Sequence, residues 1–130
     1  MMVFTTPDDM GRAVSDWRTA GDTVCLVPTM GAIHDGHLAL VTAGKKAANR
    51  VVVSIYVNPT QFIAGEDFDS YPRNLQADQQ ALEAAGGVDA IYAPPVMYRD
   101  QHATHIVPSG AALPMEGETR PHFFTGVATI

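Results

Sequence analysis

Two histidines that flank an aspartate and a glycine carry the strongest chemical signal in this 130-residue sequence. His34 and His37 stand three positions apart, so their side chains share a face if helical geometry has begun by His34. Gly36 has no side chain, which lets a phosphate or an adenine approach the backbone closely. The first turn of a helix also offers free N–H groups and the positive end of its dipole. Together these features predict a site for a triphosphate whose charge must be neutralised as pyrophosphate departs.

The elements that must position this motif alternate between apolar strands and helices. The motif lies in residues 28–37, between a strand and a helix, and a second polar loop, residues 58–73, follows the strongest strand. This alternation predicts an α/β fold, a Rossmann-like open parallel sheet with helices on both faces. Ligands of such sheets gather at the carboxyl ends of the strands, from which both loops leave. The predicted strands are residues 23–28, 51–57 and 88–93, and the predicted helices are residues 7–20, 38–49 and 73–85.

Beyond Pro95 the pattern weakens. Residues 104–108 are a candidate strand, and residues 111–115 are a candidate single turn of helix. The last residues, 123–130, are apolar and carry no stop signal, polar tail or cap. We therefore expect residues 1–130 to form one Rossmann-like, nucleotide-binding domain that stops partway through a larger fold.

The charge balance and the cysteine count argue against several classes of protein. A net charge of −6 with scattered basic residues argues against nucleic acid as the main partner. No segment approaches the roughly 20 apolar residues of a membrane span, so we expect no membrane partner. The single cysteine, Cys25, lies in an apolar run, where a small buried hydrophobe is the more ordinary role than a reactive thiol. A lone cysteine also fits a reducing cytoplasm.

Two sequence blocks carry a resemblance to a known family. Residues 27–38 read Val-Pro-Thr-Met-Gly-Ala-Ile-His-Asp-Gly-His-Leu, and residues 53–62 read Val-Ser-Ile-Tyr-Val-Asn-Pro-Thr-Gln-Phe. The first block resembles the signature of the pantothenate synthetase (pantoate–β-alanine ligase) family, within the larger group of His-x-Gly-His nucleotidylyltransferases. General adenylyl- and cytidylyltransferases share the histidines but lack the Val-Asn-Pro-x-Gln-Phe part of the second block. Shorter matches continue as far as Arg120-Pro121, so the resemblance covers almost the whole chain.

The resemblance implies a two-step reaction that uses ATP. The carboxylate of pantoate attacks the α-phosphate of ATP to give pantoyl adenylate and pyrophosphate, and the amine of β-alanine then displaces AMP to give pantothenate. Carried over by position, His37 would be the proton donor and His34 its catalytic companion. Magnesium would enter with ATP. The residues that line the ATP site would be Met30, Gly31, Ala32, Ile33, His34, Asp35, Gly36 and His37. The residues that hold pantoate and β-alanine would be Gln61, Asn58, Met30 and Phe62.

The sequence also departs from the family pattern. The Gly-Glu-Lys-Asp and Ser-Arg-Asn segments that clamp the triphosphate in the family occur nowhere in these residues, and Phe123 stands where the family has a histidine beside the local His122. Losing one preorganised donor costs about 10²–10³ in rate, so we expect a full-length parent to carry the activity. We also expect a homodimer. One alternative is a non-catalytic module that binds ATP or pantoate and self-associates. Another is a related nucleotidylyltransferase with a different acceptor.

A second histidine pair raises the possibility of a metal site. His102 and His105 could in principle join His34 and His37 as four ligands. Neither pair has acidic or cysteine neighbours in a standard zinc spacing, so we expect no metal site on the protein.

Overall fold

The computed structural model describes all residues from 1 to 130, and they form two compact units. The first unit comprises Met1–Tyr56 and Pro72–Met97, and the second comprises Val57–Tyr71 and Tyr98–Ile130. Each unit is described by itself below.

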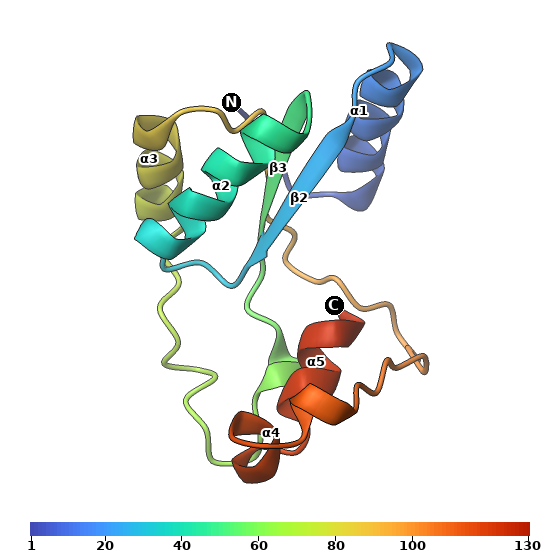
Figure 1. The fold of residues 1–130 in the computed structure, drawn as a ribbon, viewed down its shortest axis with the longest axis vertical. Coiled ribbons are helices and arrows are strands. Elements are labelled where there is room, and N and C mark those ends of the chain that lie inside the picture. The colour runs from blue at the N-terminus through green and yellow to red at the C-terminus, as the bar shows by residue number, and fades with distance from the viewer. The chain divides into compact units, whose positions relative to one another are not determined.

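The first unit is built on a sheet of four parallel strands in the order β1-β4-β3-β2 (Figure 1). The predicted open parallel sheet is therefore confirmed. The strand absent from the prediction is β1, which is three residues long and lies at an edge of the sheet, too short for any periodic pattern. The strands are β1 (Met2–Phe4), β2 (Val24–Thr29), β3 (Arg50–Ile55) and β4 (Ala90–Tyr92).

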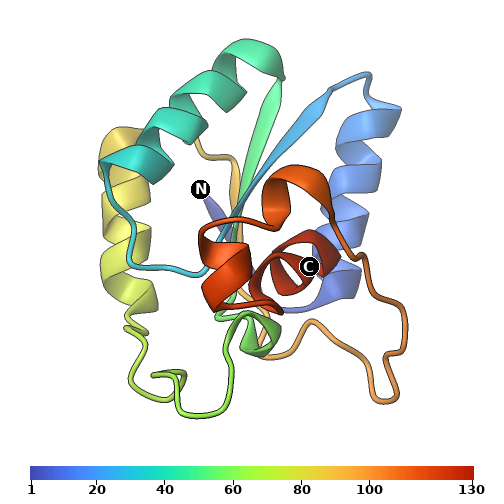
Figure 2. The same cartoon turned by 60° about the horizontal axis from the view of Figure 1, so that its bottom comes forward.

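Helices cover both faces of this sheet. Figures 1 and 2 show α2 and α3 on one side of the strands and α1 on the other. Because side chains alternate along β3, Val51 and Val53 pack toward Val41 of α2 and Leu82 of α3, whereas Val52 packs toward Met10 of α1. All of these side chains are buried. The helices are α1 (Pro7–Thr19), α2 (Asp35–Ala47) and α3 (Leu75–Ala85).

The ends of these helices follow their local sequence. The N-cap of α1 is Thr6, whose hydroxyl oxygen accepts from the Asp9 amide at 3.2 Å, and Pro7 occupies the first helical position. Asn74 caps α3 by accepting from the Ala77 amide at 3.1 Å. The prediction for α2 was wrong at its start, because the helix begins at Asp35, three residues before the predicted Leu38. His34 caps this helix, and histidine is outside the usual set of capping residues.

The second unit contains only short helical elements. They are the 3₁₀ turns η1 (Pro59–Gln61) and η2 (Gly110–Ala112) and the helices α4 (Glu116–Thr119) and α5 (Phe123–Thr129). The predicted strand at residues 104–108 is wrong: these residues have no regular structure, and the Ile106 amide donates to the Thr129 hydroxyl instead of to a strand. The predicted turn at residues 111–115 is shifted, since η2 begins at Gly110. The longest helices, α1 and α2, have 13 residues each, and none of the helices qualifies as a membrane span.

Candidate functional site

The loop from β2 to α2 is held in a tight, unusual conformation. Gly31 has φ of +87° and Ala32 has φ of +52°, which is the left-handed region that glycine adopts readily and alanine rarely does. The Thr29 hydroxyl ties the start of the loop to β3, because it donates to the Ser54 carbonyl at 2.8 Å and accepts from the Gly31 amide at 3.2 Å. The loop therefore leaves the carboxyl end of β2 in one defined direction.

His34 and His37 cap the helix that follows by exchanging hydrogen bonds with its first turn. The Gly36 amide donates to Nδ1 of His34 at 3.1 Å, and the His34 amide donates to Nδ1 of His37 at 3.3 Å. The two imidazole rings lie with centroids 4.1 Å apart. This arrangement is a capping box made entirely of histidines.

The capping box fixes which ring nitrogen of each neutral histidine can act as a donor. A ring nitrogen that accepts a hydrogen bond carries no proton, so in a neutral imidazole the proton resides on the other nitrogen. Both His34 and His37 accept at Nδ1, and each therefore presents Nε2–H as a donor. These two donors stand at the start of α2, where the positive end of the helix dipole lies. The Nε2–H groups of His34 and His37 thus form a donor cluster suited to an anion.

The environment of His37 favours its neutral form. Burial lowers the pKa of His37, and the neighbouring His34 lowers it further, while the negative charge of Asp78 acts in the opposite direction. The neutral form is also the one that the capping box requires at Nδ1.

Gly36 has a packing role that the sequence did not reveal. A Cβ atom at this position would lie 2.9 Å from Cε1 of His34, which is closer than ordinary contacts allow. Glycine is thus needed for the His34 ring to fold back over the helix start. Its predicted role in the approach of a phosphate stays a prediction.

Asp78 supports this loop from helix α3, and the sequence analysis missed it. It belongs to α3, is 6% exposed, and accepts from the amides of Ala32 and Ile33 at 3.2 and 2.8 Å. The available signal was its spacing: Asp78 stands four residues before the buried Leu82, so the carboxylate faces the core side of its helix.

Asn58 and Gln61 meet in the second unit. Asn58 is 1% exposed, and its amide nitrogen donates to Oε1 of Gln61 at 2.9 Å and to the Gly126 carbonyl at 3.1 Å. Its oxygen accepts from the amide and the hydroxyl of Thr60. The hydrogen bond from Asn58 to Oε1 therefore fixes the orientation of the Gln61 side-chain amide.

A half-buried ion pair also holds this turn. Arg120 donates to the Gln61 carbonyl at 2.8 Å and pairs with Glu66, with its Nε 2.6 Å from a carboxylate oxygen. The hydrogen bond from Arg120 lowers the pKa of Glu66, and the carboxylate raises the pKa of Arg120. The guanidinium also lies 4.4 Å from the centroid of Phe123, so phenylalanine at this position serves as a stacking partner for Arg120.

The other predicted site residues have less defined partners. Phe62 is half-buried in an aromatic cluster. Its ring makes edge contacts with the rings of Phe68 and Tyr71, with centroids 5.3 and 5.7 Å apart. Met30 is half-buried in the loop after β2. The structure thus brings together His34 with His37 in the first unit, and Asn58 with Gln61 in the second.

Neither histidine pair belongs to a cluster of metal ligands. His102 and His105 lie in the second unit with ring centroids 5.5 Å apart, and no group of three or more histidine, cysteine or acidic side chains could hold a metal ion.

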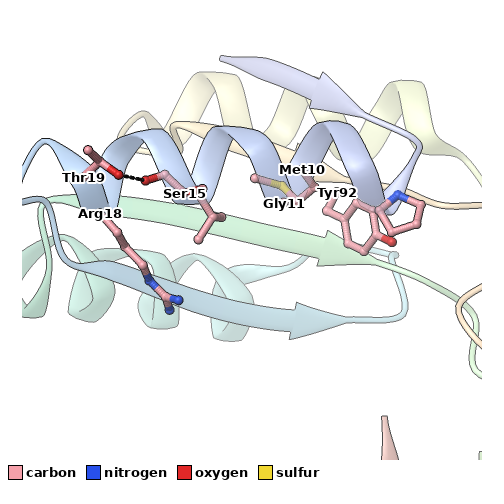
Figure 3. Close-up of a pocket in the computed structure, with 8 residues that line it drawn as sticks. Met10, Gly11, Ser15, Arg18, Thr19 and Tyr92 are labelled. Atoms are coloured by element: carbon pink, nitrogen blue, oxygen red, sulfur yellow. Dashed lines mark hydrogen bonds between the residues drawn. The ribbon is translucent and has the colours of Figure 1, made fainter.

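A separate cavity lies against α1 and contains none of the predicted site residues. Its volume is about 690 Å³, and Figure 3 shows Met10 and Tyr92 toward one end and Arg18 and Thr19 toward the other. Thr19 donates to the Ser15 carbonyl within its own helix at 2.9 Å. Arg18 is the one charged side chain of the lining.

The sequence matches one family over almost its whole length. The model of the family described as pantoate-β-alanine ligase matches residues 2–130. The chain belongs to this family. Among its curated relatives are pantothenate synthetase 2 of Bradyrhizobium diazoefficiens, 51% identical, and the pantothenate synthetase of Rhodopseudomonas palustris, 52% identical. Each alignment covers 99% of this chain and 46% of the relative, so the chain spans about half the length of these relatives.

Solved structures of this ligase family share the fold. Pantothenate synthetase from Thermus thermophilus superposes with a TM-score of 0.81 at 42% identity, over 99% of this chain and 46% of that one. Pantoate-β-alanine ligase from Francisella tularensis, complexed with β,γ-ATP and β-alanine, gives a TM-score of 0.84 at 34% identity, over 99% and 50% of the two chains. The predicted family and the predicted α/β fold are both confirmed.

Proposed function

We propose that this chain supplies the ATP- and pantoate-binding part of an enzyme that condenses pantoate with β-alanine. In the first step a carboxylate oxygen of pantoate bonds to the α-phosphorus of ATP, and the bond from that phosphorus to the β-phosphate oxygen breaks to release pyrophosphate. In the second step the neutral amine of β-alanine bonds to the activated carbonyl carbon, the bond from that carbon to the phosphate oxygen breaks, AMP leaves with the bonding electrons, and the nitrogen releases one proton to solvent. Family membership supports the reaction, and the donor cluster at the start of α2 supports the nucleotide.

The observation that carries this proposal is that His34 and His37 both accept backbone hydrogen bonds at Nδ1, which in a neutral ring leaves Nε2–H as a donor. A carboxylate is a nucleophile at neutral pH, so the first step needs positioning and charge neutralisation more than a strong base. Two imidazole donors at the positive end of a helix meet that need for a phosphate chain. We assign His37 and His34 as catalytic residues. The proposed ATP lining is Met30, Gly31, Ala32, Ile33, His34, Asp35, Gly36 and His37.

For pantoate and β-alanine we propose Gln61, Asn58, Phe62 and Met30. Asn58 donates to the side-chain carbonyl oxygen of Gln61. The side-chain N–H groups of Gln61 would then donate to an acceptor of the substrate, such as a carboxylate or hydroxyl. Asn58, at 1% exposed and with four hydrogen bonds, acts by orienting Gln61.

Magnesium, a partner copy and a compartment complete the proposal. The loop of residues 28–37 offers imidazoles and amides with Asp35 as its single carboxylate, whereas magnesium prefers several oxygen ligands. Magnesium would therefore arrive on the phosphates of ATP and shield their charge.

We also propose a homodimer, because exposed apolar side chains such as Leu26 and Leu40 offer a surface for a second copy of the chain. We further propose a cytoplasmic location, where ATP is available.

Binding without turnover is the second candidate function. The loop of residues 28–37, called the phosphate loop below, favours this candidate, because it contains no lysine or arginine to neutralise a departing pyrophosphate. Pyrophosphate release from Mg-ATP on addition of pantoate separates the two candidates. Release that depends on pantoate and is lost in His37→Gln supports the ligase reaction, and ATP binding with no release supports the second candidate.

Three controls make this experiment specific. His102→Gln changes an exposed histidine of the other unit and should leave ATP binding unchanged. A panel of other hydroxy acids tests whether pantoate is the acceptor. A chain that binds neither ATP nor pantoate at millimolar concentration would contradict both candidates.

A further inference from the structure

The phosphate loop, residues 28–37, rests on a buried carboxylate that belongs to another part of the chain. The oxygens of Asp78 accept from the amides of Ala32 and Ile33, which stand 46 and 45 positions earlier in the sequence. A Cβ atom on Gly31 would lie 2.8 Å from one of these oxygens, so the loop and the carboxylate are packed in direct contact. Helix α3 thus holds the loop at three consecutive residues.

The position of this carboxylate is unfavourable for anion binding as such. Its negative charge lies against a loop whose donors face a proposed triphosphate, and like charges repel. It also occupies two backbone amides that would otherwise be available to a phosphate. A carboxylate at this position favours ATP binding only if the loop order that it provides strengthens binding more than its negative charge weakens it.

The geometry of the loop shows why this order is needed. Ala32 has φ of +52°, a conformation that a non-glycine residue holds only where its surroundings fix it. The two hydrogen bonds to Asp78 fall on Ala32 and the residue after it, and the next residue is His34, which caps α2. The direction in which the chain enters α2 is therefore set by Asp78.

We propose that Asp78 is a positioning residue of the nucleotide site, which holds residues 31–33 so that the donors of His34 and His37 face the triphosphate. This inference rests on the proposed ATP-binding role of the loop. The carboxylate of Asp78 acts on the site through the backbone amides of Ala32 and Ile33.

Three variants of the 130-residue chain test the proposal. Asp78→Asn keeps the size of the side chain but offers one acceptor oxygen and no charge. Asp78→Glu keeps the charge but lengthens the side chain against Gly31. Asp89→Asn is the matched control, because Asp89 is also an aspartate of the first unit that accepts from a backbone amide, that of Val51 at 2.8 Å, away from the phosphate loop.

The first measurement is the dissociation constant for Mg-ATP. We expect both Asp78 variants to weaken ATP binding by about tenfold or more, and Asp89→Asn to change it by less than about threefold. Unchanged or tighter binding in Asp78→Asn would overturn the proposal, since charge repulsion would then be the dominant effect. Equal loss in Asp78 and Asp89 variants would also overturn it, because the effect would be one of general stability.

The second measurement does not depend on ATP and therefore separates this inference from the proposed function. In Asp78→Asn the amides of Ala32 and Ile33 should exchange with solvent at least about tenfold faster, while the Val51 amide keeps its rate. The pKa of His37 should fall further, because the charge of Asp78 raises it. Unchanged exchange and an unchanged pKa would refute the positioning role, even if the unmodified chain proved unable to bind ATP.

Discussion

Replacing Asn58 with alanine should destabilise the second unit by about 1–3 kcal/mol, a sum built from the separate hydrogen bonds of its side chain. The buried Gly126 carbonyl loses one of its two donors, the Asn58 amide at 3.1 Å, and keeps the Ile130 amide at 3.3 Å, so this loss costs about 0.5–1.5 kcal/mol. The bond to half-buried Gln61 contributes about 0.5–1.5 kcal/mol more. Thr60 is exposed, so water replaces its two bonds to Asn58 at little cost.

Hydrogen exchange at the Gly126 amide is the assay that reports this loss locally. The amide donates to the His122 carbonyl at 3.0 Å at the start of α5, which packs against η1 beside Asn58. A loss of about 1–3 kcal/mol corresponds to exchange faster by about 5- to 150-fold. Fluorescence of Trp17, the single tryptophan, follows the first unit in the same sample.

The control for this prediction is another asparagine that caps a helix. Asn74→Ala removes the cap of α3 in the first unit and should cost about 1 kcal/mol there, with no change at Gly126. If exchange at Gly126 in Asn58→Ala stayed within about threefold of the unmodified chain, the side-chain network would contribute nothing to the unit, and the orienting role of Asn58 toward Gln61 would fall with it.

Three further predictions follow from the same contacts. Because the folded chain lowers the pKa of His37 below its usual 6.5, the unfolded chain binds the proton more readily, so stability is full above about pH 6.5 and decreases as the pH falls toward the folded value. Urea unfolding between about pH 5 and 8 should show this decrease, and His37→Gln should reduce it. His34→Gln should raise the pKa of His37 in an NMR titration; a further fall would contradict the stated effect of the neighbouring ring. Gly126→Ala should destabilise the second unit by about 1–3 kcal/mol despite the better helix propensity of alanine, because its Cβ would lie 2.5 Å from the Thr60 carbonyl oxygen. Exposed Val127→Ala is its control in the same exchange assay.

Much of the first unit could be predicted because its local signals agree with its tertiary structure. The apolar run at 51–57 becomes the buried central strand β3, and Thr6 with Pro7 starts α1 as the capping preferences predict. The motif at 34–37 could be placed at a helix start for the same reason. What the sequence could not show is that the two histidines form the cap themselves, since this depends on ring orientations.

The features that were predicted wrongly or missed share a different cause: their structure depends on contacts between residues that are far apart in the sequence. Residues 104–108 have strand-forming side chains, but no strand lies beside them to complete a ladder, and Val107 is 77% exposed. Helix α5 was not predicted because Gly126 weakens its local propensity, and that same glycine permits the close packing on η1. Asp78 was missed because its partners lie 45 and 46 positions away.

The most direct test of the account is a titration of Mg-ATP into the chain with labelled histidines. The donor cluster predicts that the Nε2 signals of His34 and His37 shift together, that those of His102 and His105 stay in place, and that bound triphosphate raises the pKa of His37. His37→Gln should weaken the binding by about tenfold or more, approaching the effect expected for a lost charge-stabilising donor. Saturable ATP binding that leaves the signals of His34 and His37 unmoved would contradict the assignment of this loop as the nucleotide site.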